Sequence, residues 1–428
     1  MARPLLVVVA VTVGLVDPAI GIDNGLGLTP PLGWRSWNLF AADVNQTLLE
    51  SIMDGLVARK RMVDGVPTSL CDLGYCEVGL DDAWQACGDH DGYNYHDALG
   101  RPLVNLTRFP DMAAMTAKAH SLGLTAGWYH NNCICRELKE PTHEMYVQDV
   151  HFLADVFHFD AVKLDGCGKQ YDLDLWASLI NKTGRPIMIE NCHWGQTVPT
   201  ETWCPWNYFR TSEDIVASYD SVVKNLQSTI QWAQRGLSRP GCWGYPDMLE
   251  VGVTGLSFTE ARSHFGAWCI VSSPLILSHD INDDAVSDEI WPVISNREAL
   301  AVNQAWAGHS GSPFKQSSDA IELSELDDEL DDEEVGAIPV WQYFYKPLGG
   351  GKVAVLMMNH APSEQHLTLN LKDVPGLACS TCRVRDIWDR RDLPDAHGTF
   401  EASLPSHDSA FLVFSAAQDE PAPVQIFL

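Results

Sequence analysis

Basic residues are scarce in this chain, and so are long apolar runs. The sequence has 28 Lys and Arg against 57 Asp and Glu, a formal net charge of −29 at pH 7. Such a surface repels nucleic acid and anionic membranes, so we expect neither as a partner. No apolar stretch reaches the ~18 residues that a membrane-spanning helix needs. The 15 histidines form no HxH or HExxH pair, so the sequence indicates no metal site.

The N-terminal segment is typical of a secretory signal peptide. Arg3 precedes the apolar run "LLVVVAVTVGLV", and the small residues Ala19 and Gly21 follow it, so we expect residues 1–21 to be removed. Twelve cysteines, an even number, suit disulfides in an oxidising compartment. We therefore predict the secretory pathway, with an extracellular or a vacuolar or lysosomal destination. Candidate N-glycosylation sequons begin at Asn45, Asn105 and Asn181.

Short apolar runs that end in polar residues recur along the first two thirds of the chain. Helical patterns, such as residues 111–123 and 216–236, separate several of them. Strands that alternate with helices predict a parallel sheet, and eight repeats predict a (β/α)₈ barrel over residues 22–310. The eight candidate strands are residues 31–38, 76–84, 124–132, 161–167, 186–194, 208–215, 241–248 and 268–277.

The pattern changes after residue 310. Alternating runs are joined by turns, such as the hairpin signal "PLGGGK" at residues 347–352, and no long helical pattern intervenes. We predict a C-terminal antiparallel β-sandwich domain over residues 311–428. Its acidic run at 322–334 is interpreted as a solvated loop, because it lacks the glycine-punctuated spacing of a calcium loop.

Polar residues gather at the carboxyl ends of the predicted barrel strands, where active sites of such barrels lie. A single Asp after a strand is most often a helix N-cap or a turn residue, but several at the same relative position indicate a site. Large aromatics fall near the same ends; each alone is more typical of core, but together they favour a carbohydrate platform. The polar residues are Asp81, Asp82, Asp165, His193, Asp214 and Asp247.

Lys163 and Asp165 lie two residues apart in a predicted strand, so both side chains point the same way. Arg210 and Asp214 lie on the sixth predicted run and would project into the same pocket. Two carboxylates flanking a bond are what glycoside hydrolysis requires. Lys163 would keep Asp165 ionised as a nucleophile, and the second carboxyl should have a raised pKa, although Arg210 would oppose that. A purely structural Lys163–Asp165 ion pair is the alternative.

A set of ordered motifs carries a family resemblance. "PPLGWRSWNLF", "VGLDDAW", "RFPDM", "VKLDGCG", "RTSEDI" and "YPDMLEVG" together resemble the melibiase-type α-galactosidases, glycoside hydrolase family 27. The resemblance runs from about Leu28 to Ser415. It implies a (β/α)₈ barrel joined to an antiparallel β domain. It also implies cleavage of terminal α-linked galactose with retention through a covalent intermediate, without a cofactor or metal.

The resemblance also implies residue roles. Asp165 matches the family's catalytic nucleophile, and Asp214 matches its general acid/base. Trp37, Asp81, Asp82, Lys163, Arg210 and Asp247 match residues that hold the galactose hydroxyls. Adjacent Asp81 and Asp82 would face opposite ways in a regular strand, so both reaching the sugar requires an irregular strand end.

The chain departs from the family pattern at several of these positions. Arg35 stands where the family usually has Asn, and Ala83 stands where it often has Cys. His193 replaces the Glu of "CEW" that contacts the sugar 2-position, and Tyr245 replaces an acidic residue. The preferred sugar could therefore differ at that carbon, with α-N-acetylgalactosaminide or β-L-arabinopyranoside as alternatives.

The family resemblance also bears on the cysteines. It implies that Cys167 pairs with Cys133 or Cys135, and that Cys192 pairs with Cys204. Cys379 and Cys382 are close enough in sequence to pair locally. The sequence does not assign Cys71, Cys76, Cys87, Cys242 and Cys269.

Two other classes of function compete with the hydrolase. A Schiff-base aldolase would use Lys163, but the neighbouring carboxylate would hold that amine protonated. A lectin would bind sugar without cleaving it, against which the presence of both Asp165 and Asp214 argues. For a hydrolase we expect an acidic pH optimum. A homodimer is compatible with the sequence, which does not define the oligomeric state.

Overall fold

The computed structural model describes residues 22, 24–323 and 336–417. The predicted signal peptide (1–21) and most of the acidic run (322–334) lie outside these residues. Within the described part of the chain, we find no helix that is long and apolar enough to cross a membrane.

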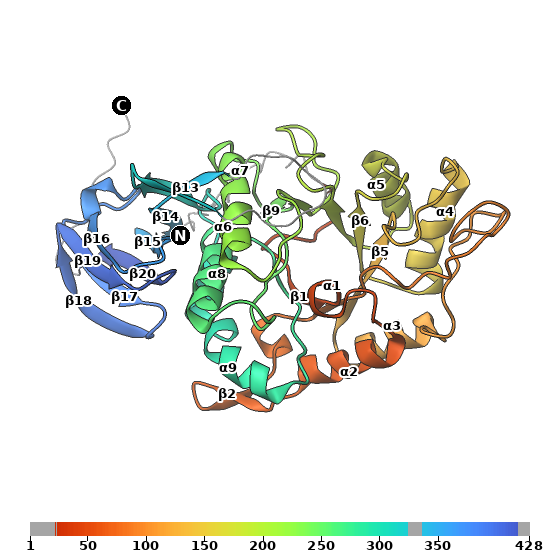
Figure 1. The fold of residues 1–428 in the computed structure, drawn as a ribbon, viewed down its shortest axis with the longest axis horizontal. Coiled ribbons are helices and arrows are strands. Elements are labelled where there is room, and N and C mark those ends of the chain that lie inside the picture. Colours follow the sequence, from red (N-terminus) through yellow and green to blue (C-terminus); the bar gives the residue numbers. More distant parts are fainter. Residues whose placement is uncertain (1–21, 23, 324–335, 418–428) are drawn as a thin grey trace, which may run out of the picture.

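Eight parallel strands form the barrel, in the order β10-β1-β4-β5-β6-β7-β8-β9 (Figure 1). A parallel bridge between Leu249 and Leu277 joins the segment after β9 to β10, the other edge strand of this order. The predicted (β/α)₈ barrel is confirmed. The strands are β1 (Leu32–Arg35), β4 (Glu77–Gly79), β5 (Thr125–His130), β6 (Ala161–Asp165), β7 (Met188–Cys192), β8 (Tyr208–Arg210), β9 (Trp243–Tyr245) and β10 (Leu275–Leu277).

Helices surround these strands, and most begin at a side chain that accepts a backbone N–H of the first turn. Asn45, Asp111 and Thr142 do so for α2, α3 and α4, as Ser257 does for α8. The longer helices are α2 (Gln46–Val57), α3 (Met112–Ser121), α4 (His143–His151), α5 (Leu173–Lys182), α6 (Tyr219–Ser228), α8 (Phe258–Ile270), α9 (Asp284–Ile294) and α10 (Arg297–Gln304). Shorter elements are α1 (Trp37–Phe40), α7 (Ile230–Gln234) and the hairpin of β2 (Arg61–Val63) with β3 (Val66–Thr68).

Most predicted strands extend past the observed ones, as 76–84 does past β4 and 208–215 past β8, and two predicted elements differ further. The eighth predicted strand, 268–277, begins inside helix α8, and only Leu275–Leu277 is extended. Helix α8 is buried nearly all round, so its apolar run resembles a strand, and Pro274 follows its end. The predicted helix at 216–236 is divided into α6 and α7 at Thr229, whose hydroxyl donates to the carbonyl of Leu226.

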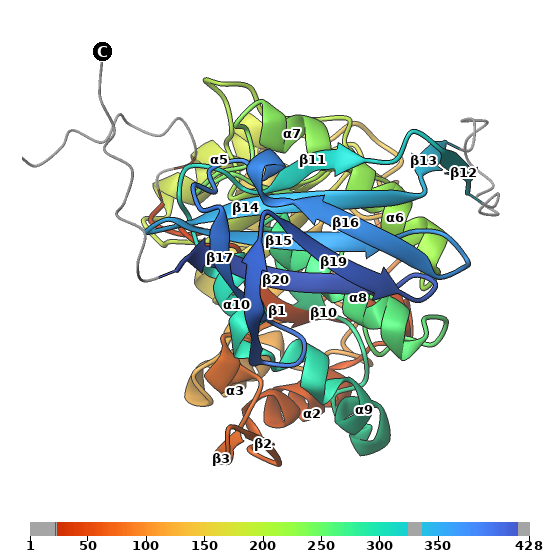
Figure 2. The same cartoon turned by 90° about the vertical axis from the view of Figure 1, so that its left-hand side faces the viewer.

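In the C-terminal domain, one antiparallel sheet folds over itself in the order β11-β14-β15-β20-β17-β18-β19-β16 (Figure 2), and β12 pairs with β13 in a separate two-stranded sheet. In β15, Val353 and Val355 pack within the sandwich, while Ala354 and Leu356 pack into the core shared with the barrel. The predicted antiparallel β-sandwich domain and the hairpin at 347–352 are confirmed. The strands are β11 (Ser312–Gln316), β12 (Ala320–Glu322), β13 (Ala337–Pro339), β14 (Trp341–Gly349), β15 (Lys352–Asn359), β16 (Gln365–Asn370), β17 (Thr381–Asp386), β18 (Arg391–His397), β19 (Thr399–Leu404) and β20 (Ser409–Ala416).

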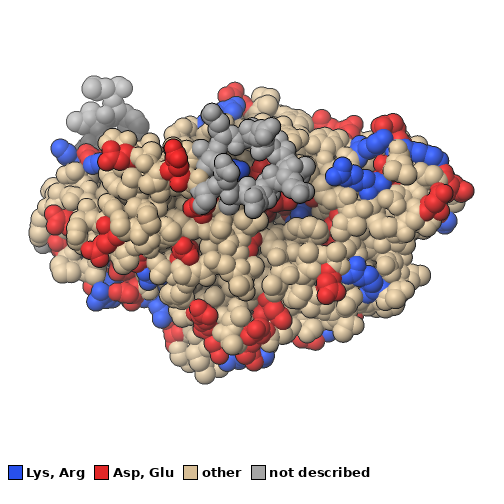
Figure 3. Space-filling model, in the orientation of Figure 1, with Lys and Arg blue, Asp and Glu red and all other residues tan. Residues whose placement is uncertain are grey.

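Helix α8 joins the two parts, because it packs on β14, β15 and β20 of the sandwich. Gly266 permits the close approach: a Cβ atom there would lie 2.8 Å from Cζ2 of Trp388. The architecture changes between Gln304, the end of α10, and Ser312, the start of β11. Charged side chains are dispersed over the face seen in Figure 3, and some basic ones are paired, as Lys60 is with Asp284.

Five disulfides connect the described residues, and two of them match predicted pairs: Cys133–Cys167 and Cys379–Cys382. The predicted Cys192–Cys204 pair is wrong. Cys192 ends β7 inside the barrel, whereas Cys204 packs in the outer core and bonds to Cys242. The pair that the family resemblance implies does not form, because the two sulfurs lie in different parts of the core. The full set is Cys71–Cys76, Cys87–Cys135, Cys133–Cys167, Cys204–Cys242 and Cys379–Cys382.

Candidate active site

Lys163 and Asp165 on β6 both point into the barrel, and each is 5% exposed. Lys163 Nζ lies 2.9 Å from Asp81 Oδ2 but 4.0 Å from Asp165 Oδ2. Its main partner is therefore Asp81, not Asp165. Glu190, beside Lys163 in the β6–β7 register, does not compete for the ammonium because Arg35 already binds its carboxylate.

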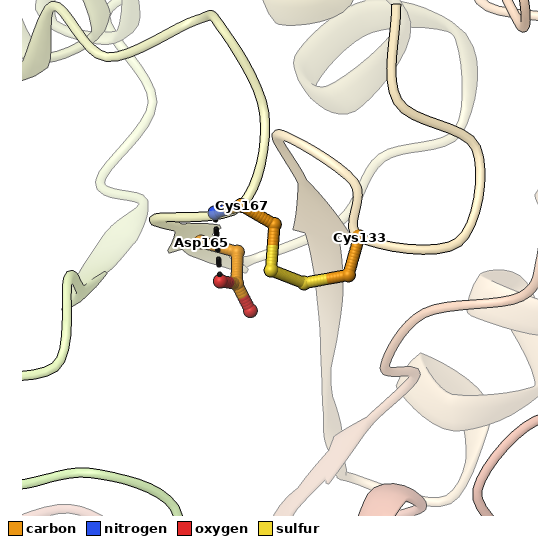
Figure 4. A group of neighbouring side chains, drawn as sticks. All are labelled: Cys133, Asp165 and Cys167. Atoms are coloured by element: carbon orange, nitrogen blue, oxygen red, sulfur yellow. Dashed lines mark hydrogen bonds between the residues drawn. A yellow bond between two sulfur atoms is a disulfide. The ribbon is translucent and has the colours of Figure 1, made fainter. Parts of the chain in front are cut away.

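Asp165 sits among donors and next to a disulfide. Tyr129 donates its hydroxyl to Oδ2 at 2.9 Å, and the backbone N–H of Cys167 donates to Oδ1 at 3.2 Å. Figure 4 shows the carboxylate beside the Cys133–Cys167 bond. Asp165 and these two sulfurs are close enough to suggest a metal site. However, disulfide sulfurs are not thiolates, and metals bind the thiolate form.

Burial raises the pKa of Asp165 to about 7. Lys163 and the hydrogen bond from Tyr129 act to lower this pKa, while Asp81 and Asp214 act to raise it. The sequence predicts that Lys163 holds this carboxylate ionised. The structure shows why that effect falls short: the ammonium is nearer to Asp81.

Asp214 follows β8 at the rim, where its side chain is 58% exposed. Its Oδ1 accepts hydrogen bonds from Arg210 Nη2 at 2.8 Å and from Trp194 Nε1 at 3.1 Å. Desolvation acts to raise the pKa of Asp214, but Arg210, Lys163 and these hydrogen bonds outweigh it and hold the pKa below its ordinary value. The raised pKa expected for this carboxyl is not found, because Arg210 dominates, as the sequence allowed.

Asp247 fixes Arg210 and the loop that carries Asp214. One oxygen accepts the backbone N–H of Met248 at 2.8 Å. The other accepts that of Ile215 at 2.9 Å and lies 3.1 Å from Arg210 Nη2. Asp247 has a left-handed backbone, with φ of 80°, which is uncommon for a residue with a side chain. The bonds to its carboxylate hold that conformation.

Asp81 and Asp82 lie beyond Gly79, the last residue of β4, and they diverge. Asp81 faces Lys163, a contact that the sequence did not indicate. The two oxygens of Asp82 accept four hydrogen bonds, from the backbone N–H groups of Ala83, Cys133 and Ile134 and from the side chain of Gln85. These hydrogen bonds show that Asp82 holds the loop after β5 in place.

His193 and Trp37 both pack against aromatic side chains. His193 is buried, with Nδ1 2.8 Å from the hydroxyl of Thr197, and its ring lies 4.1 Å from that of Tyr171. Burial lowers the pKa of His193 to about 4, so the imidazole is neutral near neutral pH. Trp37 packs against the aromatic cluster inside the barrel, which includes Tyr245.

A charged layer lies inside the barrel below these groups. Arg35 binds Glu190 and lies 3.6 Å from Glu77, and Tyr208 donates to Glu190 at 3.0 Å. Gly79 makes room for the guanidinium, because a Cβ atom there would lie 2.7 Å from Arg35 Nε. The departure at Arg35 is thus accommodated by partners of opposite charge.

Sequence reasoning did not assign Tyr129 and Trp194 to the site. Both belong to the large aromatics that lie near the ends of the predicted strands, at 124–132 and 186–194. Tyr129 is opposite Lys163 in the β5–β6 register, a relation that the barrel prediction could have supplied. Nothing in the sequence indicates that the indole of Trp194 reaches Asp214, because that contact depends on the loop after β7.

Comparison with known families decides what kind of barrel this is. The family model described as alpha galactosidase A matches residues 29–305. The chain belongs to this family of glycoside hydrolases. The model of the alpha galactosidase C-terminal beta sandwich domain matches residues 340–414. Among relatives, alpha-galactosidase of Cyamopsis tetragonoloba is 31% identical over 396 residues, or 90% of this chain and 86% of the relative. The alpha-galactosidase of Coffea arabica is 30% identical over 406 residues, which cover 92% of this chain and 96% of the relative.

Solved structures share the fold of this alpha-galactosidase family member. Alpha-galactosidase I from Mortierella vinacea has a TM-score of 0.74 at 24% identity and covers 92% of this chain and 99% of its own. A β-L-arabinopyranosidase from Geobacillus stearothermophilus has a TM-score of 0.72 at 18% identity, with 93% and 99% covered. Enzymes named for different sugars thus have the same architecture.

Proposed function

We propose that the protein removes terminal α-linked galactose from oligosaccharides or glycoconjugates with retention, using Asp165 as nucleophile and Asp214 as general acid/base. The supporting observation is the pair of unlike carboxyls at the barrel mouth. Asp165 is buried against Lys163 and Tyr129, while Asp214 is at the rim on Arg210. Membership of a glycoside hydrolase family supports a two-carboxylate role for this pair.

The proposed reaction has two displacements. Asp165 attacks the anomeric carbon while Asp214 gives its proton to the departing glycosidic oxygen. Asp214 then takes a proton from water, which attacks the same carbon and releases Asp165. Neither step requires a cofactor or a metal. Sugar hydroxyls would be held by Trp37, Asp81, Lys163, Arg210 and Asp247.

The protonation states of the free pocket bear on this mechanism. With a higher pKa at Asp165 than at Asp214, a single proton shared by the pair resides mostly on Asp165. The reactive form has that proton on Asp214. We propose that this minority form is the one that reacts, so the pair must hold one proton in total.

His193 gives a second candidate substrate, α-N-acetylgalactosaminide. Its Nε2 is buried and has no hydrogen-bond partner in the described structure, while Nδ1 is at the Thr197 hydroxyl. A neutral imidazole whose Nε2 carries the proton could donate to the carbonyl oxygen of a 2-acetamido group. With galactose, the same nitrogen would meet the 2-hydroxyl.

We also propose that the protein passes through the secretory pathway to an extracellular or vacuolar or lysosomal site. Five disulfides suit an oxidising compartment. Of the sequon residues, Asn45 and Asn181 are exposed and Asn105 is half-buried, so glycans at the first two are the stronger candidates. A homodimer stays a prediction.

The direct test is activity on nitrophenyl glycosides. We expect α-galactoside to be cleaved best, ahead of α-N-acetylgalactosaminide and β-L-arabinopyranoside, with α-galactose as the first product seen by NMR. Asp165→Asn and Asp214→Asn should each lower kcat/KM for a substrate with a poor leaving group, by about 10³-fold or more for Asp165→Asn. Asp155→Asn, at an exposed carboxylate outside the site, should leave activity unchanged.

Three outcomes would change the proposal. Best cleavage of α-N-acetylgalactosaminide would make it the substrate and His193 the residue that selects it. Inversion would remove the nucleophile role of Asp165. Binding of galactose without cleavage of any glycoside would favour the lectin alternative.

A further inference from the structure

Trp194 lies in a sharp turn immediately after β7. Its backbone is left-handed, with φ of 45°, and Gly195 follows with φ of 79°. A side chain at Gly195 is excluded, because a Cβ atom would lie 2.9 Å from the carbonyl oxygen of Thr211. A non-glycine residue in this conformation is strained and persists only where its surroundings hold it. The turn therefore fixes the direction in which the Trp194 indole points.

The indole ring lies on the backbone that carries the proposed nucleophile. A Cβ atom on Gly166, the residue after Asp165, would lie 2.8 Å from Cζ3 and 3.0 Å from Cε3 of Trp194. Only glycine allows this approach without displacing the rigid ring. The six-membered edge of the indole is thus seated against the end of β6.

The opposite edge of the same ring reaches the second carboxyl. Trp194 Nε1 donates to Asp214 Oδ1 at 3.1 Å, and Arg210 donates to the same oxygen at 2.8 Å. Within the described residues, the two hydrogen-bond donors found for Asp214 both bind its Oδ1 atom. Oδ2 is therefore the oxygen available for the exchangeable proton.

We propose that Trp194 is a positioning residue that spans the two carboxyl groups, fixing their separation and directing the proton of Asp214 to Oδ2. The inference rests on the proposed roles of Asp165 and Asp214. Retaining glycosidases need their carboxyl groups about 5–5.5 Å apart, so a rigid spacer between the two segments has a clear use. In the first displacement, Oδ2 gives its proton to the leaving oxygen, and the indole N–H stabilises the carboxylate that remains.

A leaving-group series separates this role from simple packing. Trp194→Phe retains an aromatic ring but removes the N–H. For aryl galactosides with poor leaving groups, which need acid catalysis, we expect kcat/KM to fall about tenfold. For 2,4-dinitrophenyl galactoside, whose leaving group needs no proton, we expect little change in the first displacement. The hydrogen bond from Trp194 lowers the pKa of Asp214, so its loss should raise that pKa and shift the pH profile of kcat/KM.

Gly166→Ala gives an independent test of the spacer. The methyl group of alanine must displace the Trp194 ring, so kcat/KM should fall. The two substitutions act on the same contact, so the fold loss of kcat/KM in the double variant with Trp194→Phe should be smaller than the product of the two single losses. Trp203→Phe is the matched control: its Nε1 donates to Asp174 Oδ1 at 2.7 Å, outside the site, and activity should not change. Circular dichroism and thermal unfolding establish that each variant is folded.

The outcomes are distinguishable. If Trp194→Phe lowers kcat/KM equally for galactosides with good and with poor leaving groups, or lowers it for neither, the role of Trp194 is overturned. Absence of leaving-group dependence in Asp214→Asn would instead overturn the proposed acid role of Asp214, whatever Trp194 does.

Discussion

At the scale of single residues, the pKa values of the two carboxyls differ in an unexpected sense. A nucleophile should have the lower pKa and an acid the higher one, but here the pKa of Asp165 is raised and that of Asp214 is lowered. Asp165 is buried and shares its ammonium with Asp81, so its pKa is raised to about 7. Asp214 is bound by Arg210, so its pKa is lowered despite desolvation. Because the two groups interact, their titration belongs to the pair. What matters for activity is the pH range in which the pair holds one proton.

This gives a pH prediction with a definite sign. Above pH 7 the pair loses its last proton, so kcat/KM should fall as pH rises through about 7. On the acid side, kcat/KM should fall only below the ordinary pKa of Asp, where the pair gains a second proton. The measurement is kcat/KM for p-nitrophenyl α-galactoside from pH 3 to pH 9. A rate that increases through pH 7, as expected if ionisation of Asp165 alone controlled activity, would contradict it.

At the scale of elements, a buried network ties the long β4–α3 connection to the loop after β5 and to α4. His96 lies between two carboxylates, with Nδ1 3.0 Å from Glu137 and Nε2 2.9 Å from Asp149. Gln170 donates to Asp149 at 2.6 Å and so extends the network to the loop after Asp165. Burial acts to lower the pKa of His96, but its two carboxylate partners raise it to about 9. The charged imidazole holds together loops that build one wall of the site.

We predict that His96→Gln destabilises the fold by about 3 kcal/mol at pH 6, because it leaves buried carboxylates without their cation. The folded pKa lies above the ordinary value of 6.5, so this stabilisation is complete below pH 6.5 and is lost as pH rises through 9. Urea unfolding with disulfides intact should thus show a smaller loss at pH 9.5. His120→Gln, at the half-exposed pair with Asp160, is the control and should cost little. Equal losses of the His96 variant at both pH values would refute the charged state.

At the scale of the whole molecule, the barrel and the sandwich share one apolar core. Leu356, Met358 and Phe411 of the C-terminal sheet belong to the same buried cluster as the outer face of the barrel strands. Helix α8 lies between the two, with Gly266 against Trp388. A shared core couples the two parts, so we expect them to unfold together.

Gly266→Ala tests that coupling. Alanine favours a helix by about 1 kcal/mol over glycine, but here its methyl group would collide with Trp388, so we expect a net loss of about 1–3 kcal/mol. Trp388→Phe in the same chain should recover part of the loss, because phenylalanine lacks the ring atoms that collide. Calorimetry should show one transition that moves as a whole. Two separate transitions, of which only one moves, would show that the parts are independent.

Much of the architecture follows from local sequence patterns. The recurrence of short apolar runs that end in polar residues indicated the eight barrel strands. The eighth run, 268–277, was misplaced because helix α8 is also apolar on nearly every side. Ordered motifs identified Asp165 and Asp214 as a pair, and the inward direction of Lys163 and Asp165 follows from the two-residue period of a strand.

Only the tertiary structure decided which partner each group chose. Lys163 binds Asp81, from a distant strand, more closely than Asp165, its neighbour in sequence. Cys204 bonds to Cys242 rather than Cys192, and Trp194 reaches Asp214. Sequence patterns fix the face on which a side chain lies, because strand and helix periods are local. Pairing across the barrel depends on strand register and on a few ångströms of side-chain reach, which the packing of the whole chain determines.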